Sequence, residues 1–186
     1  MTFTIERLNL EAVGVGPEDQ HVPRTLPGEE VELADGVARI ITPSADRVKP
    51  PCSHYKACGG CSLQHASDTF VADWKIDVVR KALSARSLAI PETTLHTSPV
   101  KSRRRAKFSA TRTKKGAMVG FMSPKSHILV PITQCWVLDP KLVEALPVLE
   151  AVTTQFASRK EVLGLQVASS EAGLDLVIQT DRDVTD

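Results

Sequence analysis

Residues 52–61 read Cys52-Ser-His-Tyr-Lys-Ala-Cys58-Gly-Gly-Cys61 and hold three of the four cysteines, and the fourth, Cys135, stands alone. This Cys-x5-Cys-x2-Cys spacing, with one distant cysteine, can place four soft thiolates around one metal centre. The two glycines before Cys61 allow the loop to fold closely over a bound group. We therefore predict that Cys52, Cys58, Cys61 and Cys135 are metal ligands.

Other roles for these cysteines have to be weighed. Disulfides form in oxidising compartments, and the first residues, Met1 to Arg7, contain no apolar region of signal-peptide length. Structural zinc more often uses two short Cys-x2-Cys or Cys/His pairs, whereas a three-plus-one set is typical of iron-sulfur ligation. His54 and His65 flank the loop as alternative ligands, although a solvated or hydrogen-bonded histidine is the commoner case. The residues favour an iron-sulfur cluster and leave zinc open.

Composition favours a globular cytoplasmic protein. The chain has 186 residues, a net charge of +1 and 42% hydrophobic residues, which is enough to build the core of one domain or of two small ones. No apolar run reaches the length of a membrane span, so we predict no membrane segment. The net charge conceals one local excess, because residues 101–115 carry eight basic side chains and no acidic one.

The N-terminal region, residues 2–48, consists of short apolar or alternating stretches separated by glycines and prolines. This pattern predicts short strands, and a small closed β-barrel would remove their exposed edges. Pro50 and Pro51 favour extended backbone and mark a boundary. We predict a β-barrel domain over residues 1–48 and an α+β domain, containing the cysteine loop, over residues 49–186.

Helices and strands are both predicted after the cysteine loop. Ser67 or Asp68 can cap a helix whose apolar stripe includes Trp74, for which core packing is favoured over base stacking. A second helix should begin at Asp139-Pro140 and run towards Phe156, with Pro147 bending or dividing it. Alternating or apolar runs predict further strands at residues 105–112, 117–122, 128–132, 162–168 and 174–180.

The basic stretch suggests a nucleic-acid partner. If residues 105–112 form a strand, Arg103, Arg105 and Lys107 share one face. Arg104 and Arg112 then take the other face. Guanidinium groups bind phosphate in a bidentate manner, and each neutralised phosphate adds a salt-dependent contribution to affinity. We therefore predict that Arg103, Arg104, Arg105, Lys107 and Arg112 bind RNA.

Several motifs, in order and spacing, resemble the iron-sulfur RNA uridine-C5 methyltransferases, bacterial enzymes that make 5-methyluridine in ribosomal RNA. The resemblance rests on Arg47-Val-Lys-Pro-Pro-Cys52, Cys58-Gly-Gly-Cys61-Ser-Leu-Gln-His65, Trp74-Lys75, Arg103-Arg-Arg-Ala106 and Ser126-His127 leading into Ile132-Thr-Gln-Cys135. Similarity to the TRAM domain is carried by Ile5-Glu-Arg-Leu8, Gly14-Val-Gly16 and Leu26-Pro-Gly-Glu29.

The resemblance implies a 4Fe-4S cluster held by Cys52, Cys58, Cys61 and Cys135. It also implies a TRAM domain with an oligonucleotide-binding barrel near the N-terminus and ribosomal RNA as the partner. Family members continue into a Rossmann-like methyltransferase domain that binds S-adenosylmethionine, and we expect that domain to be absent from these 186 residues.

Reaction chemistry leads to the same expectation. Carbon 5 of uridine is a poor nucleophile, so methylation needs a thiolate that adds at carbon 6. If all four cysteines are ligands, no thiolate remains, and we expect the chain alone to be inactive. We therefore predict the RNA-recognition and 4Fe-4S-binding N-terminal part of a methyltransferase. The alternative is a standalone, non-catalytic iron-sulfur or zinc RNA-binding module, and an electron-transfer protein is a weaker third hypothesis.

Overall fold

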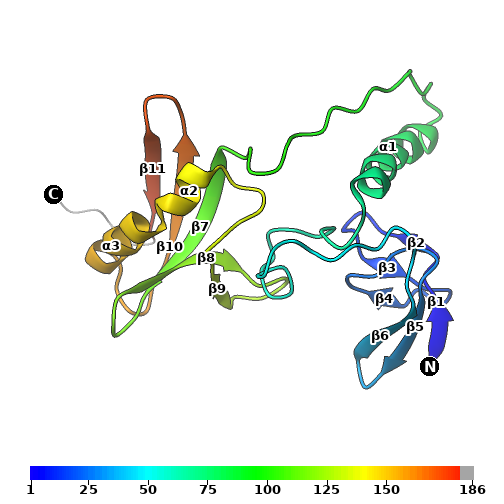
Figure 1. Ribbon diagram of the computed structural model, residues 1–186, viewed down its shortest axis with the longest axis horizontal. Coiled ribbons are helices and arrows are strands. Elements are labelled where there is room, and N and C mark those ends of the chain that lie inside the picture. The colour runs from blue at the N-terminus through cyan, green and yellow to red at the C-terminus, as the bar shows by residue number, and fades with distance from the viewer. Residues whose placement is uncertain (181–186) are drawn as a thin grey trace. The chain divides into compact units, whose positions relative to one another are not determined.

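The computed structural model describes residues 1–180, which divide into two compact units (Figure 1). The first unit contains Met1–Pro51 and Cys61–Thr97, and the second contains Cys52–Gly60 and the chain from Ser98 on. The domain boundary expected after residue 48 stays a prediction. Residues 181–186 of the predicted second domain lie outside the described residues.

The first unit contains two three-stranded antiparallel sheets. One has the order β1-β5-β6 and is formed by β1 (Thr2–Thr4), β5 (Glu30–Ala34) and β6 (Val37–Thr42). The other has the order β2-β3-β4 and is formed by β2 (Arg7–Leu8), β3 (Gly14–Val15) and β4 (His21–Val22). Buried Ile5, Val22 and Val31 form the apolar core of this unit.

The predicted closed barrel is wrong, because the described strands pair as two separate sheets. Strands β2, β3 and β4 have two residues each, too few to continue a ladder of hydrogen bonds around a ring. The sheets instead share a core, in which Val22 of β4 and Val31 of β5 cluster with Ile5, which lies between β1 and β2. The sequence reading also missed β4, a pair of residues too short to give an alternating pattern.

Helix α1 (Asp68–Ser84) begins where the sequence predicts, with the Ser67 hydroxyl accepting from the Phe70 backbone N–H at 3.2 Å. Its apolar stripe does not enter a core, because none of its residues is buried and Trp74 is only half-buried. The core-packing interpretation of Trp74 is therefore wrong. The physical reason is the small size of the first unit, whose few core residues come from its strands and loops.

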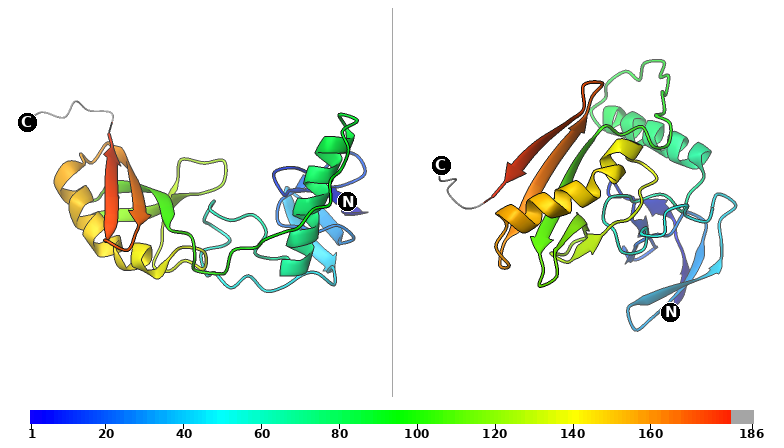
Figure 2. Two further views of the ribbon diagram at one scale, coloured as in Figure 1. Left: turned by 90° about the horizontal axis from the view of Figure 1, so that it is seen from above. Right: turned by 60° about the vertical axis from the view of Figure 1, so that its left-hand side comes forward.

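The second unit is an antiparallel five-stranded sheet with two helices on one face (Figure 2). The strand order is β11-β10-β7-β8-β9, with β7 (Arg105–Arg112), β8 (Ala117–Met122), β9 (Leu129–Pro131), β10 (Val162–Ser169) and β11 (Leu174–Gln179). Side chains from the helices, including Leu142 and Leu149, pack on Phe108 and Leu165 from the sheet. Segregation of helices to one face of an antiparallel sheet is the α+β arrangement.

The sequence-based elements of the second unit are confirmed, including the division of the second helix near Pro147. Helix α2 (Pro140–Glu144) ends before Ala145, and α3 (Leu146–Phe156) starts immediately after it. Asp139 caps α2 by accepting from the Lys141 N–H at 2.9 Å. The described structure is thus mostly β, and none of its helices is long and apolar enough to cross a membrane.

Candidate functional site

The cysteine loop is closed at its base by contacts within the first unit. These contacts are the Arg47–Ala66 β-bridge, a bond of 2.9 Å from Val48 N–H to the His65 carbonyl, and one of 2.8 Å from Ser67 N–H to the Asp46 carbonyl. Ser67 is also the cap of α1, so the start of this helix is tied to the loop base. The two ends of the segment that holds Cys52, Cys58 and Cys61 are therefore hydrogen-bonded to each other in the first unit.

A buried ion pair stabilises the loop base. The Glu29 carboxylate is fully buried and accepts from Arg47 Nη2 at 2.8 Å, from Leu26 N–H at 2.8 Å and from Ser44 N–H at 3.1 Å. Burial alone would raise the pKa of Glu29, but the hydrogen bonds from Arg47, Leu26 and Ser44 outweigh it and hold this pKa below its ordinary value. Glu29 is therefore an ionised acceptor that joins the Leu26–Glu29 turn to the loop base.

The two histidines considered as metal ligands have other surroundings. His65 is 1% exposed, and burial together with the nearby charge of Arg47 lowers its pKa. His54, within the loop, accepts through Nε2 from the backbone N–H of Thr133 at 3.2 Å. The expectation that His54 is a hydrogen-bonded histidine is confirmed.

The tip of the loop is hydrogen-bonded to the segment that carries Cys135. Besides the His54–Thr133 contact, Gln134 Nε2 donates to the Ser53 hydroxyl at 2.6 Å, across 81 positions of sequence. Cys52 precedes Ser53, and Cys135 follows Gln134. The structure thus brings the chain next to the first predicted ligand and the chain next to the last one together in the second unit.

Gly59 fits closely against the end of β8. Its N–H donates to the Met122 carbonyl at 2.9 Å, and a Cβ at this position would lie 2.6 Å from that same oxygen. The neighbouring Gly60 differs, because a Cβ there would meet its nearest heavy atom, Cys58 Sγ, only at 3.4 Å. Of the two glycines, Gly59 is therefore the one that the close approach of backbone to backbone requires.

Gly59→Ala should destabilise the chain by about 1–3 kcal/mol, because backbone atoms on both sides would have to move. Gly60→Ala is the matched control and should cost about 1 kcal/mol or less, since its new methyl group meets only ordinary contacts. Urea unfolding of both variants measures the difference. Equal stability of the two variants would show that the loop adapts without cost.

All four cysteines lie in the described part of the chain, where each is half-buried and none forms a disulfide. Cys52, Cys58 and Cys135 belong to the second unit, and Cys61 to the first. Among residues 1–180, no three His, Cys, Asp or Glu side chains are gathered closely enough to hold a metal ion. By donor chemistry, four thiolates suit an iron-sulfur cluster, and the assignment of these ligands stays a prediction.

The basic residues divide between the two faces of the second unit's sheet. Arg105 and Lys107 lie on the face opposite the helices and line a hollow of about 420 Å³ with Gln166 and Val177. Arg112 lies on the helix side, where Nη1 donates to the Ala157 carbonyl at 3.5 Å. The open face therefore presents the charged groups of Arg105 and Lys107 on the side of the sheet that carries no helix. All five predicted RNA contacts are exposed, namely Arg103, Arg104, Arg105, Lys107 and Arg112.

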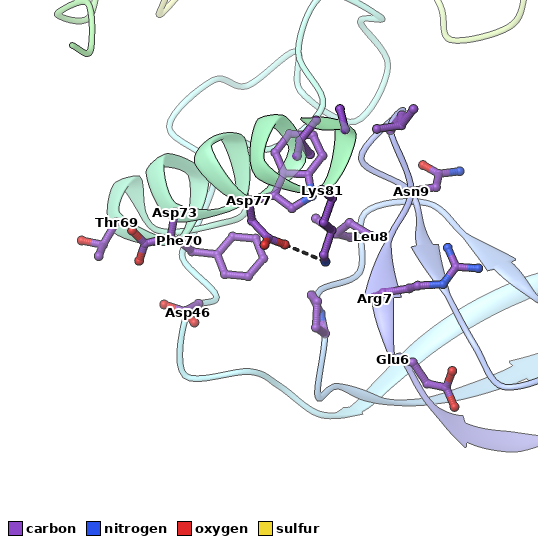
Figure 3. Close-up of a pocket in the computed structure, with 15 residues that line it drawn as sticks. Glu6, Arg7, Leu8, Asn9, Asp46, Thr69, Phe70, Asp73, Asp77 and Lys81 are labelled. Carbon is purple, nitrogen blue, oxygen red and sulfur yellow. Dashed lines mark ion pairs between the residues drawn. The ribbon is translucent and has the colours of Figure 1, made fainter. Parts of the chain in front are cut away.

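A separate groove in the first unit runs between α1 and β2 and has a volume of about 760 Å³. Figure 3 shows Phe70 and the Asp77–Lys81 ion pair on its helix side and Leu8 on its strand side. Glu6, Asp46, Asp73 and Asp77 outnumber the two cations that line it, Arg7 and Lys81. Phosphate would be repelled by this excess of carboxylates, so the groove that Trp74 lines is a poor site for RNA.

One exposed aromatic residue was missed by the sequence reasoning. Trp136 directly follows Cys135, is 40% exposed, and has the Lys101 ammonium 5.6 Å from its ring centroid. It belongs to no helical or alternating apolar pattern, and that isolation is the sequence signal that could have identified it. Trp136 and the basic segment lie in the same unit.

Curated proteins similar to this chain are named RNA methyltransferases. An uncharacterised RNA methyltransferase of Rhizobium meliloti (strain 1021) is 34% identical over 96% of this chain and 46% of its own length. Another, from Caulobacter vibrioides, is 41% identical over 84% of this chain and 40% of its own length. A protein of Halomonas elongata named 23S rRNA (uracil(1939)-C(5))-methyltransferase is 32% identical over 87% of this chain and 36% of its own length.

The chain spans less than half the length of each of these relatives. No family model matches it. The similarity nevertheless covers most of the chain, including the cysteine loop and the basic strand in the relative that matches 96% of it. Over most of its length, the chain is therefore similar to part of proteins that are named RNA methyltransferases.

Proposed function

We propose that this chain is the RNA-recognition and 4Fe-4S-binding N-terminal part of an S-adenosylmethionine-dependent methyltransferase that acts on carbon 5 of a uridine in ribosomal RNA. The observation that carries the proposal is the pairing of residues 53–54 with residues 133–134, beside the first and last predicted ligands. Relatives named as RNA methyltransferases, one of them a 23S rRNA uracil-C5 methyltransferase, support the same class of reaction.

The cluster would be held by Cys52, Cys58, Cys61 and Cys135. When bound, it would supply a rigid covalent tie between distant parts of the chain, a structural rather than a redox role. The protein contributes the Glu29–Arg47 ion pair at the loop base and the hydrogen bond from Gly59 N–H to the Met122 carbonyl at the end of β8. The first contact fixes the loop base, and the second fixes residue 59 against β8.

The chain's part in methylation would be binding and orientation of RNA. The first unit, proposed as a TRAM domain, and the open sheet face of the second unit would both contribute surface. Transfer to carbon 5 needs a thiolate nucleophile, and four cysteines committed as ligands leave none. We therefore expect no methyl transfer by these 186 residues alone. S-adenosylmethionine would bind elsewhere in the longer enzyme.

Neutralising Arg105 and Lys107 together should weaken binding of single-stranded RNA and flatten its dependence on salt. Each lost phosphate contact lowers the slope of log affinity against log salt by about 0.7, so the double Gln variant should lose about 1.4. Binding isotherms at several salt concentrations measure both quantities.

Arg112→Gln is the matched control, because this guanidinium lies on the helix side of the same strand. If RNA binds only the open face, its slope should stay close to that of the unmodified chain, and Arg112 would then drop out of the five RNA contacts expected from the sequence. An unchanged slope in the Arg105 and Lys107 variant would place the RNA elsewhere, and absence of RNA binding by the unmodified chain would overturn the proposed function.

A further inference from the structure

We infer that Trp136 is a stacking platform for an unpaired RNA base, with Lys101 and Arg103 beside it to contact the phosphates. This inference rests on the proposed RNA-binding function and adds a specific subsite to it. Aromatic rings flanked by cations are the common means by which proteins hold single-stranded nucleic acid, because every base offers a π-face.

Exposure is the first observation that points to a ligand. Within residues 1–180, Trp136 and Phe156 are the aromatic side chains that stand among the exposed large hydrophobic residues. Phe108 is fully buried, and Tyr55 is 5% exposed. An indole ring is a large apolar surface that folding normally covers. Trp136 as a whole residue is 40% exposed, so part of its side chain is available to a partner.

The ring stands on a well-anchored segment. Ile132 and Leu138, on either side of it in sequence, are 6% and 2% exposed and belong to the core of the second unit. The Trp136 carbonyl accepts from Lys101 N–H at 3.0 Å, and Arg103 N–H donates to the Val137 carbonyl at 3.0 Å. A platform held at both ends loses little conformational entropy when a base binds.

The charges around the ring suit an anionic ligand. Lys101 Nζ lies 5.6 Å from the ring centroid, near the outer limit of a cation–π contact, so the ammonium can also reach a phosphate. The nearby carboxylate of Asp139 is already bound, because Oδ1 accepts from Lys141 N–H and Oδ2 accepts from the Ser169 hydroxyl. The segment therefore presents cations and an aromatic ring, while the Asp139 carboxylate caps α2.

The other tryptophan is a natural comparison. Trp74 is half-buried in the α1–β2 groove, which carries an excess of carboxylates. The same side chain thus occurs once in acidic and once in basic surroundings. Stacking on RNA should be confined to Trp136, so Trp74→Ala is the matched control for Trp136→Ala.

Binding of single-stranded RNA oligonucleotides to the 186-residue chain tests the inference. Trp136→Ala should lose between about 5-fold and 150-fold in affinity, the range that corresponds to the loss of stacking on one base when an aromatic residue is replaced by alanine. The slope against salt should not change, because stacking releases no counterions. Trp136→Phe should retain most of the affinity, and Trp74→Ala should bind like the unmodified chain.

Photocrosslinking with 5-iodouridine in the same oligonucleotides, followed by peptide mapping, gives a readout that does not depend on folding of the variants. A crosslink at Trp136 is expected. If the unmodified chain binds RNA but crosslinks only elsewhere, or if Trp136→Ala binds equally well, the inference is wrong and the RNA-binding function stands. If the unmodified chain does not bind RNA, the proposed function fails together with the inference.

Discussion

Replacing Cys135 by serine is expected to remove most of the bound iron and sulfide from the anaerobically purified chain, together with its brown absorption. The unmodified chain should carry about four irons and four sulfides. The variant should also unfold more readily. Cys135 lies 74 positions after Cys61, and covalent cross-links that close long segments contribute about 2–4 kcal/mol. Metal and sulfide analysis with thermal unfolding measures both effects.

Gln134→Ala is the matched control for that change. It removes the hydrogen bond to Ser53 and leaves every predicted thiolate in place, so the iron content should persist. A colourless Cys135→Ser variant with unchanged stability and RNA affinity would refute the structural role of the cluster. Stoichiometric zinc without sulfide in the unmodified chain would overturn the cluster itself in favour of a zinc-stabilised RNA-binding module.

Glu29→Gln is expected to have the largest effect on stability in the first unit. The amide would present N–H groups where Leu26 N–H, Ser44 N–H and Arg47 now donate to a carboxylate. Loss of one member of a buried ion pair costs about 3–5 kcal/mol, which is comparable with the whole stability of a small domain. Urea unfolding measures the loss, and a proteolysis assay should show cleavage of the loop base.

Glu30→Gln is the neighbouring control, because Glu30 is less buried and accepts one hydrogen bond, from the Thr42 hydroxyl at 3.0 Å. Its cost should be about 1 kcal/mol or less. Similar losses in the two variants would show that the Glu29–Arg47 pair does not hold the loop base.

The buried carboxylate of Glu29 and the buried imidazole of His65 together predict how stability changes with pH. Both lowered pKa values act in one direction, because the unfolded chain binds protons more readily than the folded one. The contribution of His65 is lost as pH falls below its ordinary value of 6.5, and that of Glu29 as pH falls below 4.5. The free energy of unfolding should therefore decrease in these two stages on acidification, and Glu29→Gln should remove the second.

Local patterns in the sequence were reliable where an element is long enough for its period or its cap to be recognised. The Ser67 cap, the division of the second helix near Pro147 and the strands from Arg105 to Gln179 follow from periodicity and capping, which depend on neighbouring residues. The closed barrel failed because closure depends on pairing between distant strands, and two-residue strands carry too little pattern to specify it.

The sequence alone determined which chemistry is available: four thiolates in a three-plus-one spacing, a basic strand and no cysteine to spare. Only the tertiary structure decided how these groups are presented. It placed Arg105 and Lys107 on the open face and Arg112 on the helix side of the sheet. It also left Trp136 exposed beside Lys101 while half-burying Trp74 among carboxylates. The reason is physical: residue type fixes charge and ligand softness, whereas exposure and pairing depend on contacts between segments far apart in the chain.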